Sequence, residues 1–176
     1  SWRSSGTKET TVITIEHDLD IIGEADYVVE LGPGAGTGGG ELIACGTVDE
    51  VKQNERSVIA PYLGCRDNRL RRTQAATEKP DCIRILGAQA NNLKDIDVVI
   101  PLGRLVCGTG VSGSGKSSLI IEVLYKALWS SLHDPRAIPG KHRGVQGVEK
   151  IKDVYCIDQS PISRSKTSIP ATLSGR

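Results

Sequence analysis

The run from Gly110 to Ser117 carries the residue types that bind the phosphates of a nucleotide. Its sequence, Gly-Val-Ser-Gly-Ser-Gly-Lys-Ser, fits the pattern G-x-x-x-x-G-K-[ST] at every fixed position. Glycines let backbone N–H groups turn around phosphate oxygens, because a Cβ atom would obstruct the approach. Lys116 is placed to reach the outer phosphates, and the Ser117 hydroxyl is placed to bind Mg²⁺. The run therefore predicts a binding site for ATP and Mg²⁺.

The residues on either side of this run supply the context that the motif requires. The apolar run Leu105–Cys107 precedes it and predicts a buried strand, and a helix is expected from Lys116 to Leu132. The start of that helix would add the positive end of its dipole to the phosphate site. A chance Gly/Ser-rich turn would not need this strand and helix. The residues expected to contact the nucleotide are Gly110, Val111, Ser112, Gly113, Ser114, Gly115, Lys116, Ser117 and Ser118.

The chain upstream of residue 64 alternates strand-like and helix-like segments. A capping aspartate, Asp18, predicts a short helix over 18–24, and the capping box of Thr47 and Glu50 predicts a helix to about 54. The glycine-rich stretch 32–40 predicts a loop. Strands are expected over residues 11–15, 27–31 and 41–45.

Residues 64–80 are charged and poor in apolar side chains, which predicts a linker. Beyond it, strands are expected over residues 83–86, 96–100 and 154–157, in addition to the strand before the glycine run. Alternating strands and helices of this kind indicate an α/β protein.

The bulk properties fit a soluble protein of the cytoplasm. The 176 residues carry a formal net charge of +1, no secretory signal is visible, and no apolar run approaches the ~20 residues of a membrane span. The five cysteines are scattered and never spaced C-x-x-C, so neither a disulfide framework nor a zinc site is predicted. The absence of methionine indicates that Ser1 is not a native start.

Two further residues give the phosphate-binding run a family context. His17 follows the strand expected over 11–15, and Gln159 follows the strand expected over 154–157. With the glycine run, they resemble the switch histidine and the Q-loop glutamine of ATP-binding cassette (ABC) ATPases. In that family the histidine comes last in a cassette, whereas here it comes first. The order indicates that the chain spans the junction between two tandem cassettes.

The amino-acid sequences of several segments resemble those of the UvrA family of ABC ATPases, which recognise DNA damage in bacteria. The resemblance extends from about Val12 to Leu173, and its most specific strings are residues 158–162 and the glycine-rich loop after Gly32. Ser163 departs from the family, which has glycine there, and this puts only local turn geometry in doubt. The similar segments are residues 16–18, 25–36, 39–41, 92–97, 109–119 and 157–162.

The resemblance implies a role for each site residue. Lys116 and Ser117 would bind the phosphates and Mg²⁺ of the second of two ATP molecules. Gln159 would sense Mg²⁺ or the attacking water and couple that site to the attached domain. His17 would contact the γ-phosphate of the first ATP, at a different composite site, so His17 and Lys116 are not expected to be partners.

The resemblance also implies an incomplete P-loop NTPase of the ABC ATPase type. Residues 1–63 would form the C-terminal part of the first nucleotide-binding domain, and residues 81–176 would form the N-terminal part of the second. Residues 64–80 would link the two domains. Each part would then hold an interrupted sheet with exposed edges. The ABC signature, the acidic strand and the zinc-binding modules of the intact family are missing, so the chain alone is expected to bind ATP weakly and to hydrolyse none usefully.

The implied setting is bacterial nucleotide excision repair and the SOS response. Implied partners are damaged double-stranded DNA, a UvrB-type helicase subunit and a second copy in a homodimer, with no membrane. Lesion specificity is not encoded in these motifs. Three alternatives stay open: a UvrA-like paralogue in drug self-resistance, an unrelated P-loop module, and a non-catalytic assembly fragment.

Overall fold

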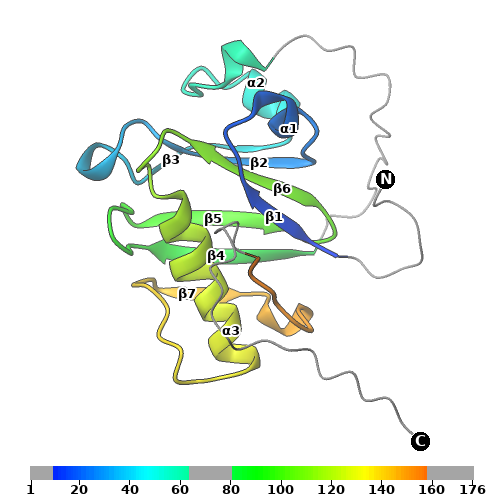
Figure 1. Cartoon of the computed structure of the whole chain (residues 1–176), viewed down its shortest axis with the longest axis vertical. Coiled ribbons are helices and arrows are strands. Elements are labelled where there is room, and N and C mark those ends of the chain that lie inside the picture. Colours follow the sequence, from blue (N-terminus) through cyan, green and yellow to red (C-terminus); the bar gives the residue numbers. More distant parts are fainter. Residues whose placement is uncertain (1–9, 64–80, 158–176) are drawn as a thin grey trace, which may run out of the picture.

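One four-stranded sheet is built from strands on both sides of the expected linker. A computed structural model describes residues 10–63 and 81–157 of the chain, and Figure 1 shows the strands side by side in the upper half of the molecule. The sheet order is β1-β6-β2-β3, with β6 parallel to both β1 and β2, and β2 antiparallel to β3. The strands are β1 Val12–Ile15, β2 Tyr27–Gly32, β3 Glu41–Gly46 and β6 Leu105–Gly110.

The central place of β6 differs from the expectation of two separate interrupted sheets. Its middle residues are all buried, and a buried parallel strand must satisfy its backbone groups on both edges. β1 and β2 supply those edges. Asp26 adds a further connection, since its N–H donates to Leu105 O (2.9 Å) and its Oδ2 accepts from Leu105 N (2.8 Å).

The capping signals predict two short helices, and both lie on one side of this sheet. Helix α1 (Leu19–Gly23) is capped by Asp18, whose side chain accepts a hydrogen bond from Asp20 N. Helix α2 (Val48–Lys52) begins with the complete capping box of Thr47. The predicted loop over 32–40 contains one 3₁₀ turn, η1 (Gly36–Gly38), and a second turn, η2 (Ala60–Tyr62), follows α2.

A second, antiparallel sheet has the order β5-β4-β7. It consists of β4 (Cys82–Ala88), β5 (Ile96–Pro101) and β7 (Gly144–Gln146), and the 3₁₀ turn η4 (Val148–Lys150) follows. Buried side chains alternate along β4 and β5, which is the pattern that predicts both strands. The sequence does not predict β7, because a strand of three residues that begins with Gly144 and is followed by Gly147 gives almost no periodicity.

Two segments differ from the sequence prediction. The helix expected from Lys116 to Leu132 is wound as a π-helix over η3 (Ser118–Tyr125) before α3 (Lys126–Leu132) continues it as an α-helix. The predicted strand over 154–157 is wrong, since those residues form no strand. Tyr155 is 80% and Ile157 90% exposed, and among the described residues no strand runs beside them to complete a ladder.

The core has two layers, one on each face of the four-stranded sheet. The smaller cluster lies between this sheet and helices α1 and α2, and its members include Ile22, Val28, Val48, Val51 and Cys107. The larger cluster fills the space between the two sheets and η3, below the four-stranded sheet in Figure 1. Burial raises the pKa of Cys107 to about 12, as expected of a thiol that serves only as a small core residue.

Candidate phosphate-binding site

The phosphate-binding loop leaves β6 in a backbone shape that needs its glycines. Gly110, Gly113 and Gly115 have φ angles of +131°, +76° and +109°, which side-chain-bearing residues rarely adopt. A Cβ atom on Gly110 would lie 2.0 Å from Leu31 O, which rules out a side chain there. The loop is therefore a backbone cradle of the kind that surrounds phosphates.

Lys116 lies folded back into this cradle. Its Nζ donates to Gly110 O (2.9 Å) and to Val111 O (2.8 Å), and the residue is only 6% exposed. Burial lowers the pKa of the ammonium group from its ordinary value, because desolvation penalises the charged form. Among the described residues, two carbonyls and no carboxylate hold this buried cation, so an anionic ligand would stabilise its charge.

The loop also holds a polar atom without a partner. Ser114 is fully buried, and its Oγ has no hydrogen-bond partner among the described residues. Buried hydroxyls are normally satisfied. The helix that follows presents its first N–H groups, which have no intrahelical acceptors, towards the same loop. The glycines, the ammonium, the orphaned hydroxyl and the helix start together fit a nucleotide phosphate chain.

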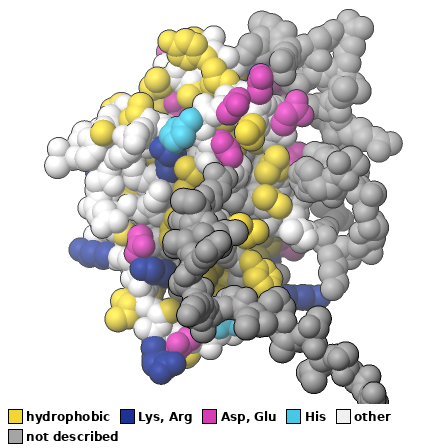
Figure 2. All heavy atoms as spheres, in the orientation of Figure 1, with side chains coloured by type: hydrophobic (Ala, Val, Ile, Leu, Met, Phe, Trp, Pro, Cys, Tyr) yellow, Lys and Arg dark blue, Asp and Glu magenta, His cyan; other side chains and the backbone are white. Residues whose placement is uncertain are grey.

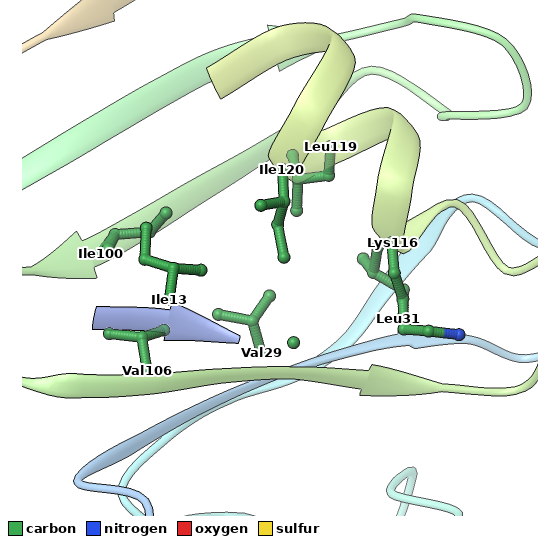
Figure 3. Close-up of a pocket in the computed structure, with 9 residues that line it drawn as sticks. Ile13, Val29, Leu31, Ile100, Val106, Lys116, Leu119 and Ile120 are labelled. Atoms are coloured by element: carbon green, nitrogen blue, oxygen red, sulfur yellow. The ribbon is translucent and has the colours of Figure 1, made fainter. Parts of the chain in front are cut away.

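An apolar pocket lies directly behind the loop. Figure 3 shows Ile13, Val29 and Val106 of the four-stranded sheet facing Ile120 of η3, with Ile100 of β5 beside them. The Lys116 side chain extends away from these apolar side chains, so its nitrogen lies outside the pocket. The side chains that line the pocket pack η3 against the sheets, and this packing holds the start of the helix behind the phosphate cradle.

His17 comes to the same edge of the sheet as the phosphate-binding loop. β1 runs parallel to β6 with Ile15 opposite Gly108, and Glu16 N donates to Gly108 O at 3.0 Å. Since His17 is the next residue, it leaves the sheet at the carboxyl end from which the loop also departs. The two segments therefore share one sheet, and the assignment of His17 and Lys116 to separate sites stays a prediction.

The remaining expected ligand lies outside the described residues. Gln159, assigned to Mg²⁺ or the attacking water, follows the last described residue, Ile157. Ser117 lies in the first turn of the helical segment that starts at Lys116, directly before η3. Within residues 10–63 and 81–157, no group of three or more His, Cys, Asp or Glu side chains could hold a metal ion. Ser117 is thus the one expected Mg²⁺ ligand that the described part of the chain contains.

Asn92 is a site residue to which the sequence assigns no role. It lies in the turn between β4 and β5, and its Nδ2 donates to Gly113 O of the phosphate-binding loop and to Gly36 O of the glycine-rich loop, at 3.0 Å each. The string 92–97 carries part of the family resemblance. Only the tertiary structure shows that its first residue contacts the phosphate-binding loop.

Charged side chains of both signs share the face shown in Figure 2. Acidic side chains gather in its upper part, over α1, where Asp18, Asp20 and Glu24 are exposed, and Lys and Arg side chains lie mainly in its lower half. In the described part of the chain, no helix is both long and apolar enough to cross a membrane.

The central parallel strand, the glycine cradle and the buried lysine define an α/β protein with a P-loop. Comparison with known proteins narrows the class. The chain is 48% identical over 166 residues to UvrABC system protein A of Micrococcus luteus, and 43% identical over 167 residues to that of Bacillus subtilis. Each alignment covers 94% of this chain and 17% of the relative. No family model matches.

The chain belongs to the UvrA family and spans about one sixth of the length of these relatives. The crystal structure of UvrA2 from Deinococcus radiodurans is 34% identical, with a TM-score of 0.42 over 85% of this chain and 19% of that chain. The sequence-based recognition of UvrA and the α/β P-loop fold class are both confirmed.

Proposed function

We propose that this chain binds Mg-ATP through the loop from Gly110 to Ser117. The observation that carries the proposal is the pair of hydrogen bonds from Lys116 Nζ to the carbonyls of Gly110 and Val111 inside a buried cradle. ATP would supply the triphosphate, and Mg²⁺ would supply positive charge beside it. Lys116 exchanges its two carbonyl acceptors for phosphate oxygens, backbone N–H groups of the loop donate to the phosphates, and Ser117 offers its hydroxyl to the metal.

His17 and Gln159 are the proposed catalytic residues of the whole protein. His17 would contact a γ-phosphate, and Gln159 would sense Mg²⁺ or the attacking water. Residues 1–63 and 81–176 would belong to the first and second cassettes of the full-length protein, joined by 64–80. The chain alone is expected to hydrolyse no ATP usefully, because phosphoryl transfer needs the signature and an acidic residue as well.

The full-length protein would be the ATPase component of bacterial nucleotide excision repair in the cytoplasm. Support comes from identities of 43–48% to proteins named UvrABC system protein A. Damaged duplex DNA, a UvrB-type subunit and a second copy in a homodimer are the proposed partners. A full-length protein that failed to bind damaged DNA in the presence of ATP would overturn this part of the proposal.

Calorimetric titration of the 176-residue chain with Mg-ATP tests the nucleotide site. The unaltered chain is expected to bind, and Lys116→Ala is expected to bind about tenfold to a hundredfold more weakly, as loss of a hydrogen bond to a charged group predicts. Lys141→Ala is the matched control, because Lys141 is exposed and its side chain makes no described hydrogen bond or ion pair. Equal affinities for the two variants would overturn the assignment of Lys116.

A further inference from the structure

The amide group of Asn92 connects two glycine-rich loops that are far apart in the sequence. One N–H of its Nδ2 donates to Gly36 O and the other to Gly113 O, both at 3.0 Å. A side-chain amide has two N–H donors, so the whole donor capacity of Asn92 is spent on this bridge. The residue lies on neither loop, but in the turn between β4 and β5.

Backbone hydrogen bonds reinforce the same three-way junction. Gly36 N donates to Gly113 O and Gly40 N donates to Ser114 O, each at 3.0 Å, and Lys94 N donates to Gly40 O at 2.9 Å. The loop from 34 to 40 therefore lies directly against the phosphate-binding loop, with the β4–β5 turn closing the third side.

The contact is too close for side chains on the glycine-rich loop. A Cβ atom on Gly40 would lie 1.7 Å from Asn92 O, and one on Gly39 would lie 3.1 Å from Ser114 Cα. The backbones thus meet directly, and the hydrogen bonds that join them hold each peptide group in one orientation.

These hydrogen bonds determine which way the phosphate-binding loop presents its N–H groups. A trans peptide unit points its C=O and its N–H in opposite directions. Holding Gly113 O towards Asn92 directs the N–H of Ser114 towards Val111 O, to which it donates at 3.1 Å. Holding Ser114 O towards Gly40 directs the N–H of Gly115 away from the glycine-rich loop.

We infer that Asn92 is a positioning residue, which holds the Gly113–Ser114 peptide in the closed loop shape that surrounds the phosphates and couples occupancy of the site to the loop from 34 to 40. This inference rests on the proposed binding of Mg-ATP. Asn92 does not touch the nucleotide. It acts through the carbonyl groups that it holds, so its effect on phosphate affinity should exceed its effect on the stability of the nucleotide-free chain.

The test compares Asn92→Ala and Asn92→Asp with a matched control in the same turn. Asp has the shape of Asn and no N–H donor, so both variants remove the bridge. Gln89→Ala is the control, since the Gln89 amide donates only to Asp95 at the surface, at 2.9 Å. Calorimetry with Mg-ATP is expected to show affinity lowered by about tenfold or more in both Asn92 variants, as two lost hydrogen bonds predict, with an unchanged Kd for Gln89→Ala.

A second measurement uses the unaltered chain, so the test survives if the variants fold poorly. Hydrogen exchange of the Gly36 and Gly40 amides is expected to slow when Mg-ATP is added. If the unaltered chain binds Mg-ATP while both Asn92 variants match it, or while these amides exchange at an unchanged rate, the inference is overturned and the nucleotide site stands. If the loss of melting temperature in the nucleotide-free variants accounts for their loss of affinity for Mg-ATP, Asn92 is merely structural and the inference is again overturned. If the unaltered chain binds no Mg-ATP, the proposed site fails and the inference fails with it.

Discussion

Replacement of Glu30 by alanine should remove a large fraction of the stability of this chain. Glu30 lies in β2 and is 1% exposed. Its carboxylate accepts from the hydroxyl of Ser57 (2.5 Å), from Val58 N (2.8 Å) and from Ile59 N (3.2 Å). One buried side chain thus satisfies three donors of the segment that follows α2, so that segment depends on it.

The size of the effect follows from the three donors that alanine would leave unpaired. Hydrogen bonds to a charged group contribute about 1.5–3 kcal/mol each, and leaving their partners buried carries the desolvation penalty. Two of the three are short and the third is long, so the expected loss in the free energy of unfolding is about 3–5 kcal/mol. Since a whole domain is stable by only about 5–15 kcal/mol, Glu30→Ala should be close to unfolding at room temperature.

Glu30→Gln should cost much less, about 1 kcal/mol. A glutamine keeps one carbonyl oxygen for the two backbone donors, and its amide group can donate to Ser57 Oγ. Ser57 Oγ remains available as an acceptor, as its hydrogen bond from Ala60 N at 3.1 Å shows. The two substitutions therefore separate the loss of hydrogen bonds from the loss of charge.

Urea unfolding followed by circular dichroism measures both values. Glu55→Ala serves as the control, because Glu55 is exposed and its side chain makes no described hydrogen bond or ion pair; it should change the free energy of unfolding by less than about 0.5 kcal/mol. The reasoning is refuted if Glu30→Ala costs no more than this control, or if Glu30→Gln is as destabilising as Glu30→Ala.

Three further predictions test the shared sheet, the phosphate cradle and the acid response. Asp26→Ala leaves Leu105 N without its 2.8 Å acceptor and should lower the free energy of unfolding by about 1–3 kcal/mol in urea; no loss would contradict the pairing of the two segments. Gly110→Ala places a Cβ 2.0 Å from a backbone carbonyl, so calorimetry should detect no Mg-ATP binding, and retained affinity would contradict the described loop shape. The Tyr155 hydroxyl is the main cause that lowers the pKa of Asp153, so this carboxylate stabilises the fold above its ordinary pKa and the contribution disappears as the pH falls through the lowered value. Asp153→Asn should thus have a lower melting temperature than the unaltered chain at neutral pH and the same melting temperature in acid. A difference in melting temperature that is equal at both pH values would contradict the role assigned to the Asp153 carboxylate.

Much of the local structure could be predicted because its causes lie within a few residues. The capping groups of Asp18 and Thr47, and the β-branched runs of β1 and β2, act on their own segments and are observed as expected. The failures have long-range causes. Residues 154–157 have the composition of a strand but no neighbouring strand in the described structure. The π-helical η3 packs in one core cluster with strands of both sheets, and no residue pattern within the segment indicates that winding.

The candidate site divides in the same way. The residue types from Gly110 to Ser117 by themselves predict a phosphate-binding loop, since the glycine φ angles and the lysine charge are properties of those residues. The glycine-rich loop, the Asn92 bridge and the position of His17 depend on which strands lie beside β6. The sequence by itself therefore determined the chemistry of the site. Only the tertiary structure decided which distant segments surround it, because strand pairing satisfies backbone groups that are identical in every residue except proline and so carry no signature in the sequence.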